Sequence, residues 1–489
     1  MLVRTAVSLM YIELHCHSHY SFREGASSPD ELVSAARGAG YDALALTDHD
    51  NLAGAMEFSQ VASANGVRPI IGTEITLRDG AHLTLLAETA CGYGNISRLI
   101  SRAHLSSPRD RPTLDPEALH GCTEGVIALS GCRDGEIPRL IEAGDVDIAF
   151  EKAAWYTAMF GEQNFFIELQ RNFIHGDRAR NLGLVNLARR LGLPLVATNN
   201  VHYHEQKRHR LQDVLVAIRH RSTLDASEHV RRKNTEFYLK SPQEMADLFA
   251  DLPEAIANTR VIAQRCTFDL TRDLTYRFPD FKSPDGREAD EVLEEICIKS
   301  AREKYGWFTP ELEARIQDEL DLVRRSGQAG FFLRNWEIMR YARDNHLPAR
   351  GRGSSVGSLI CYLLGLSGID PIKYKLFVGR FLNESRRKED VPDIDIDFAR
   401  EARERMFEHV FATYGTDYAA MVANVITYRY PMAIRDVGKA LALPEADIDK
   451  LAKRMRGRFA RSLTAEMLDM PEFGAFIRAD LARVRATRQ

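Results

Sequence analysis

Three aspartates alternate with isoleucines where residues 391–398 read VPDIDIDF. In an extended strand, alternate side chains point to the same face, so Asp393, Asp395 and Asp397 form a row of carboxylates. Such a row repels itself unless a cation binds it, and divalent cations such as Mg²⁺ bind carboxylate oxygens. Two metal ions on this row would suit an in-line phosphoryl transfer. The alternative interpretation is a solvated acidic strand edge.

A glycine-rich segment lies upstream, where residues 350–359 read RGRGSSVGSL before an apolar stretch at 359–366. Glycines and small hydroxyl residues at a helix start offer backbone N–H groups to an anion, which predicts a phosphate cradle. The segment lacks the Lys-Ser/Thr ending of a Walker loop, so that class of nucleotide hydrolase is not indicated. Arg380, within FVGRFL at 377–382, is the candidate clamp for a triphosphate. A purely structural turn is the alternative.

The charge balance changes between these two motifs. Residues 331–390 hold eleven Lys and Arg against six Asp and Glu, although the whole chain has a formal net charge of −4. Local positive charge beside a carboxylate row favours a polyanion with metal-bridged phosphates.

Histidines mark a second candidate site near the N-terminus. Residues 11–17 read YIELHCH, which alternates like a strand and places His15 and His17 on one face. Further apolar strands are followed by polar side chains that could converge at one end of a barrel. These are Asp48, His49, Glu74, His104, Cys132, Asn200 and His202. Imidazoles, carboxylates and a thiol together favour Zn²⁺ or Mn²⁺.

The order GRGS, FxxRFL and PDIDIDF resembles the palm of the bacterial C-family DNA polymerases, the group that contains the DNA polymerase III alpha subunit. The resemblance implies that Asp393 and Asp395 are the catalytic carboxylates that bind Mg²⁺. It also implies that Gly353 and Ser354 contact the triphosphate of the incoming dNTP. The segments VITYRY at 425–430 and AIRDVGKAL at 433–441 are similar to the segment that connects palm and thumb in this family. Their sequences are closer to those of the error-prone branch.

The N-terminal pattern resembles the PHP phosphoesterase domain, a distorted β/α barrel with a trinuclear metal site. The resemblance implies nine metal ligands: His15, His17, Glu24, His49, Glu74, His104, Cys132, Asn200 and His202. Asn200 stands where the family commonly has Asp, and His204 is an alternative donor. An active site of this kind would use a metal-bound hydroxide on a phosphodiester, as in a 3′–5′ exonuclease. A relic metal site that only stiffens the domain is the alternative.

The composition is that of an ordinary globular protein. The 489 residues are 45% hydrophobic and 27% charged, which predicts two to four domains without disorder. No apolar run reaches membrane-spanning length. The seven cysteines form no CxxC pair, which fits a reducing compartment, and we expect a cytoplasmic protein.

The expected fold class is α/β, with an N-terminal PHP barrel, a nucleotidyltransferase-type palm and the start of a helical thumb. The expected domains are residues 1–268, 269–425 and 426–489, with a connecting segment at 269–284. Helices are expected at 242–265, 285–305, 309–325, 331–345 and 462–488.

Polymerases of this family complete their active site with a third carboxylate and fingers that follow the thumb. We therefore expect DNA synthesis to need a further C-terminal part or a second polypeptide. The expected partners are primer–template DNA, dNTPs and a sliding clamp or other replication and repair proteins, with no membrane. Two alternatives remain: an autonomous metal-dependent 3′–5′ exonuclease, and a non-catalytic remnant that only binds.

Overall fold

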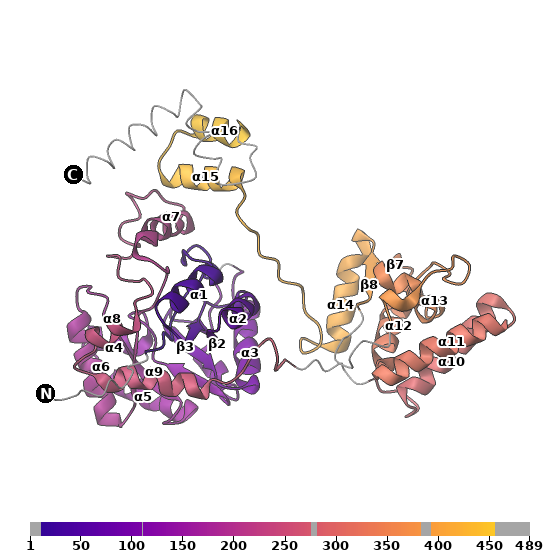
Figure 1. Cartoon of the computed structure of the whole chain (residues 1–489), viewed down its shortest axis with the longest axis horizontal. Helices are drawn as coiled ribbons and strands as arrows, with labels where there is room; N and C mark the ends of the chain where they lie inside the picture. Colours follow the sequence, from indigo (N-terminus) through magenta and orange to yellow (C-terminus); the bar gives the residue numbers. More distant parts are fainter. Residues whose placement is uncertain (1–10, 110, 275–280, 383–392, 455–489) are drawn as a thin grey trace. The chain divides into compact units, whose positions relative to one another are not determined.

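The computed structural model describes residues 11–109, 111–274, 281–382 and 393–454. It divides into two compact units (Figure 1). The first unit comprises the described residues of Met1–Leu274 and Val425–Gln489, and the second those of Thr275–Asn424. The division between the units after Leu274 lies six residues beyond the expected boundary at 268/269.

Six strands form the sheet of the first unit, in the order β1-β2-β3-β4-β5-β6. Neighbouring strands are parallel except that β3 runs antiparallel to both β2 and β4. The strands are β1 (Ala43–Leu46), β2 (Arg68–Thr76), β3 (His82–Ala87), β4 (Val126–Leu129), β5 (Phe165–Gln170) and β6 (Leu195–Thr198).

The segment 11–17 closes this sheet into a distorted barrel. On one side, the Ala45 N–H donates to the Glu13 carbonyl at 2.9 Å, next to β1. On the other side, the Val201 N–H donates to the His15 carbonyl at 2.9 Å, just after β6. The edges of an open sheet are thereby paired, and the expected α/β barrel is confirmed.

Helices surround the barrel (Figure 1). The strands are buried on both faces, which explains their near-continuous apolar runs. The helices are α1 (Pro29–Gly38), α2 (Ala55–Ala64), α3 (Ala90–Ser106), α4 (Glu136–Ala143), α5 (Val146–Phe160), α6 (Asp177–Leu191), α7 (His209–Arg219), α8 (Pro242–Leu248) and α9 (Pro253–Arg265).

Local sequence signals set several of these helix ends. Ser28 caps α1 in a capping box with Glu31, and Pro29 occupies the first helical position. The helix expected over 242–265 is two helices, because α8 ends at Leu248 and Pro253 begins α9. Proline fits the first turn of a helix but disrupts its interior.

Two later helices also belong to the first unit, α15 (Tyr430–Ala440) and α16 (Glu445–Arg454). The Leu224 N–H, in the loop after α7, donates to the Ala440 carbonyl at 2.9 Å. The segment expected to start a thumb at 426 thus packs on the barrel unit. The helix expected at 462–488 lies outside the described residues.

The second unit is mainly helical, with a two-stranded antiparallel sheet. Its apolar core joins the helices to the inner faces of both strands. Its elements are α10 (Ala289–Tyr305), α11 (Pro310–Ser326), α12 (Ala329–Asp344), β7 (Ala349–Arg352), α13 (Leu359–Leu363), β8 (Asp395–Phe398) and α14 (Arg403–Tyr414). Helices α10, α11 and α12 follow the expected ranges 285–305, 309–325 and 331–345 closely.

Across both units, each helix within the described residues is too short or too polar to cross a lipid bilayer.

Candidate functional site

The predicted ligands of the barrel converge around Glu74, a carboxylate that is 1% exposed within β2. Its oxygens lie 3.3 Å from His15 Nε2, 3.3 Å from His17 Nε2 and 3.0 Å from His49 Nε2. Glu24 joins the group through His49 Nε2, at 3.2 Å. These side chains come from segment 11–17, the loop after it, the loop after β1, and β2, so four elements assemble one cluster.

His202 and Asn200, which follow β6, complete one side of the cluster. His17, His49 and His202 place ring nitrogens within 4.8 Å of one another. His202 Nδ1 lies 2.8 Å from the Asn200 carbonyl, which leaves Nε2 as the nitrogen that can bind a metal. Asn200 Oδ1 is buried and has no hydrogen-bond partner among the described residues, so it retains a free lone pair beside the histidines. His204, the alternative donor, places its Nδ1 2.7 Å from Ser27 Oγ.

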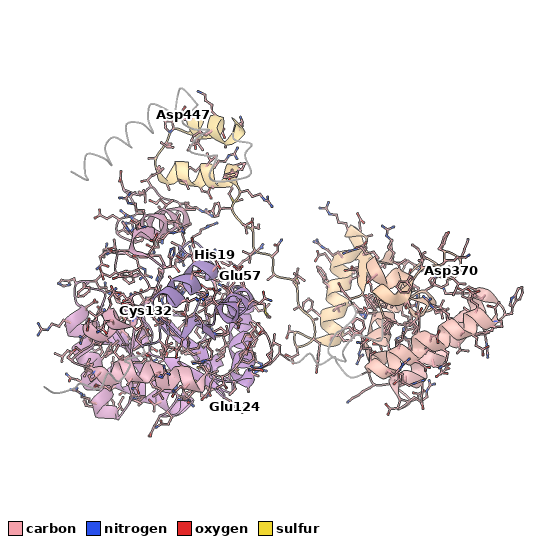
Figure 2. All side chains as sticks on the ribbon, in the orientation of Figure 1. His19, Glu57, Glu124, Cys132, Asp370 and Asp447 are labelled. Carbon is pink, nitrogen blue, oxygen red and sulfur yellow. The ribbon has the colours of Figure 1, made fainter. Side chains whose placement is uncertain are left out.

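Cys132 follows β4 and extends the cluster on the opposite side; Figure 2 labels it among the side chains of the first unit. Its Sγ lies 3.5 Å from His82 Nδ1, and Cys132, His82 and Asp134 form a further group with metal-ligand spacing. His82 also groups with His49 and Glu74. Two overlapping groups therefore share His82.

The structure separates His104 from the ligand cluster to which the sequence assigned it. His104 is exposed near the end of α3, and its Nε2 lies 2.7 Å from the Asp50 carbonyl. His82 takes a place among the ligands instead, as the first residue of β3. Most of the predicted ligands follow strands, whereas His82 begins one. Because β3 is antiparallel to its neighbours, its start lies at the barrel end where the others finish.

Carboxylates outside the nine predicted ligands orient the cluster. Glu168 in β5 lies 2.7 Å from His15 Nδ1, which directs the opposite nitrogen, Nε2, to Glu74. Ser21 Oγ lies 3.0 Å from His17 Nδ1. Asp48 is buried and accepts hydrogen bonds from Ser18 and Ser21, so it braces the loop. The alternating sequence FFIELQ around Glu168 held the only signal for that residue.

The histidines of the cluster differ in their pKa values. Burial alone would lower the pKa of His15, but Glu168 and Glu74 outweigh it and raise that pKa to about 10. Glu74 and Glu24 similarly overcome burial and raise the pKa of His49 to about 9. His17 differs, because burial lowers its pKa to about 3 and the charges of His49 and His15 oppose its protonation.

The donor set fits divalent metal ions. Imidazoles, carboxylates and a thiol meet in four overlapping groups whose ligand atoms lie within 4.8 Å. A pocket of about 450 Å³ opens over Glu24, His49, Glu74, Cys132 and Asn200. The mixture of nitrogen, oxygen and sulfur donors suits Zn²⁺ or Mn²⁺, and the pocket gives a substrate access to them.

The second unit places the aspartate row against the glycine-rich segment. Strands β7 and β8 pair Arg352 with Asp395 and Arg350 with Asp397. The Arg352 guanidinium lies 3.2 Å from an Asp395 oxygen and 3.0 Å from an Asp397 oxygen, so it offsets the repulsion between the two carboxylates. Asp393 is exposed just before β8.

Gly353 brings the two motifs into contact. Its φ is +76°, and a Cβ there would lie 3.0 Å from Asp395 Oδ2, so a larger residue would be strained and crowded. The neighbouring Ser354 is exposed and accessible to a ligand. The side chain of Arg380, the predicted triphosphate clamp, lies outside the described residues.

The start of α13 is not free for a phosphate, which corrects part of the predicted cradle. Glu319 of α11 is fully buried and accepts hydrogen bonds from Ser358 Oγ at 2.8 Å and from the N–H groups of Leu359 and Ile360 at 3.1 and 3.2 Å. Arg315 donates to the same carboxylate at 2.6 Å. An internal carboxylate thus fills this helix start, which leaves Gly353 and Ser354 as the exposed part of the cradle.

Two protein-family models match the chain. Residues 291–487 match the bacterial DNA polymerase III alpha NTPase domain, and residues 13–172 match the PHP domain. The PHP match lies within the barrel, and the DNA polymerase III alpha match contains both motifs of the second unit. The chain therefore carries a PHP domain followed by sequence of the bacterial DNA polymerase III alpha family.

Curated relatives match almost the whole chain. An error-prone DNA polymerase of Symbiobacterium thermophilum is 39% identical over 463 residues, which cover 91% of this chain and 42% of the relative. A DNA polymerase III subunit alpha of Treponema pallidum is 36% identical, covering 91% and 39%. An error-prone DNA polymerase of Mycobacterium tuberculosis is 37% identical, covering 92% and 42%. The chain thus spans about two fifths of these relatives.

His82 and His104 provide a matched test of the ligand assignment. We expect His82→Ala to weaken Mn²⁺ or Zn²⁺ binding at least about 100-fold, because the loss of a ligand should cost no less than the roughly 10- to 100-fold that the loss of an outer-shell partner costs. His104→Ala should leave the affinity unchanged, because among the described residues its ring bonds to the Asp50 carbonyl and belongs to none of the groups with metal-ligand spacing. Calorimetric titration measures both, and equal losses in the two variants would contradict the assignment.

Metal binding should also depend on pH. A metal ion displaces protons from His15 and His49, whose pKa values are raised to about 10 and 9, and from Cys132, whose thiol pKa is raised by burial. The affinity should therefore increase as the pH rises from about 6.5 to 8.5, by up to about tenfold per pH unit for each displaced proton. Titrations in two buffers of different ionisation enthalpy count these protons. A pH-independent affinity would contradict the expected displacement.

Proposed function

We propose that the chain is the N-terminal portion of a DNA-directed DNA polymerase of the error-prone branch, which adds dNTPs to a primer on template DNA. The observation that carries this proposal is the close approach of Gly353 to Asp395, where an added Cβ would lie 3.0 Å from Asp395 Oδ2, at the end of the β7–β8 pairing. It joins the phosphate-binding motif to the metal-binding motif, as a nucleotidyl transfer requires. The error-prone names of several relatives support the branch.

Each motif has a distinct task in this proposal. Asp393 and Asp395 hold Mg²⁺, which supplies charge neutralisation for the reacting phosphates. The exposed Gly353 backbone and the Ser354 hydroxyl orient the triphosphate. Arg352 keeps the two carboxylates of β8 close together. DNA as the substrate places this work in the bacterial cytoplasm, with a sliding clamp or other replication and repair proteins as partners.

Binding of dATP tests this site without requiring complete DNA synthesis. We expect a fluorescent dATP to bind the chain in the presence of Mg²⁺, and Asp395→Asn to weaken binding about tenfold or more through loss of a metal carboxylate. His15→Ala, in the other unit, is the control and should bind like the unaltered chain. Binding that is indifferent to both Mg²⁺ and Asp395→Asn would contradict the proposal.

We propose metal-dependent phosphodiester hydrolysis as a second activity, at the barrel site. The observation that favours it is the convergence of His15, His17, His49, Glu74 and His82 beneath an open pocket. Ligands of this kind hold Zn²⁺ or Mn²⁺, which supply a nucleophilic hydroxide near neutral pH. The protein orients these ligands through Glu168 and its own backbone, and the pocket admits a phosphodiester. The resulting reaction class is that of a 3′–5′ exonuclease.

Hydrolysis of bis(p-nitrophenyl) phosphate tests this second activity. With Mn²⁺ present, His15→Ala and Glu74→Gln should lower the rate about 100-fold, because each removes a group that holds the metal. Asp393→Asn is the matched control in the second unit and should retain full activity. A rate that persists in His15→Ala, or that falls in Asp393→Asn, would place the reaction elsewhere.

A further inference from the structure

A cationic segment forms one wall of the pocket above the metal cluster. It runs from the end of α7 to the strand-like residues before α8, and none of its basic side chains was among the predicted site residues. Those that line the pocket are His220, His229, Arg231, Arg232 and Lys233.

Most other cations at the pocket are neutralised by carboxylates. Arg231 pairs with Asp213 at 3.0 Å. On the opposite wall, Arg139 lies 3.0 Å from Asp79. These pairs leave little net charge for a ligand. The pocket therefore depends on other residues for any attraction of an anion.

Arg232 and Lys233 differ from these paired residues. Within the described residues, neither has a carboxylate at ion-pair distance; the Lys233 ammonium donates to the Glu228 carbonyl at 3.1 Å. Arg232 lies with its guanidinium carbon 4.3 Å from the centroid of the buried Phe237 ring, and one Nη lies 2.5 Å from His202 Nε2. The aromatic ring and the histidine therefore fix the guanidinium at the edge of the ligand cluster.

This placement has an electrostatic consequence. Arg232 and a metal ion compete for the same lone pair on His202 Nε2, so the guanidinium must leave that nitrogen when a metal binds there. Its attachment beside Phe237 keeps it at the mouth of the pocket. Two adjacent cations next to bound metal ions repel them unless an anion lies between the two groups. A chain of phosphodiesters supplies one negative charge per nucleotide.

We propose that Arg232 and Lys233 bind the phosphate backbone of a nucleic-acid strand and select it over small phosphate esters at the barrel site. This inference rests on the hydrolytic function proposed above and names the residues that select its substrate. The pocket of about 450 Å³ has room for a terminal nucleotide as well as the reacting phosphate. The two cations then hold the strand on the side of α7.

The test combines a binding assay with a comparison of two substrates. The binding probe is a fluorescent phosphorothioate oligothymidylate, which resists hydrolysis, titrated with the full chain and Mn²⁺ at several salt concentrations. The double variant Arg232→Gln/Lys233→Gln should bind about tenfold more weakly, with a salt slope smaller by about 1.4 for two lost phosphate contacts. We also compare kcat/KM for oligothymidylate with kcat/KM for bis(p-nitrophenyl) phosphate. The ratio of these two values should fall about tenfold in the double variant, mainly through a higher KM for oligothymidylate.

The control variant, Arg210→Gln/Arg221→Gln, removes the same charge from exposed positions on and after α7 that do not line the pocket. It should retain the affinity and the substrate ratio. The inference is overturned if Arg232→Gln/Lys233→Gln keeps its affinity and salt slope, or if the control loses as much. Failure of the unaltered chain to hydrolyse either substrate would overturn the hydrolytic proposal alone, and the binding assay would then decide the inference.

Discussion

The first unit depends on the burial of one carboxylate, Glu74, among four histidines. A buried charge is costly unless opposite charges or hydrogen-bond donors surround it. Its imidazole neighbours come from three parts of the chain, segment 11–17, the loop after β1 and the start of β3, so the electrostatic requirement of Glu74 and the closure of the barrel reinforce each other. The ligand cluster and the fold are therefore one cooperative arrangement, and segment 11–17 serves both.

The two candidate sites differ in the solvent exposure of their acidic side chains. In the barrel, Glu74 is withdrawn from water and its partners are preassembled. In the second unit, Asp393, Asp395 and Asp397 remain partly or fully accessible, and Arg352 balances their charge from the neighbouring strand. The buried arrangement suits resident metal ions, whereas an accessible row suits metals that arrive and leave with a nucleotide.

Short-range patterns predicted much of this molecule. Alternation around His15 and His17, the aspartate row and the helices α10 to α12 were all evident in the sequence, because each depends on neighbouring residues. His82 was missed and His104 chosen because His82 begins its strand, and β3 reverses direction after β2 through a short connection. Glu168 and Glu319 were missed for a different reason, because their roles depend on contacts between distant segments. Each is a carboxylate within an ordinary strand or helix, and its partners lie 153 and about 40 positions away.

The carboxylate of Glu319 has a further consequence for nucleotide recognition. Since it already accepts the first N–H groups of α13, the dipole of that helix is satisfied from within the protein. The negative charge of a triphosphate at Gly353 would then be balanced by mobile metal ions and by exposed arginines. Recognition of that kind responds to ionic strength and to the free magnesium concentration, so the cellular ion content would set how readily this site fills.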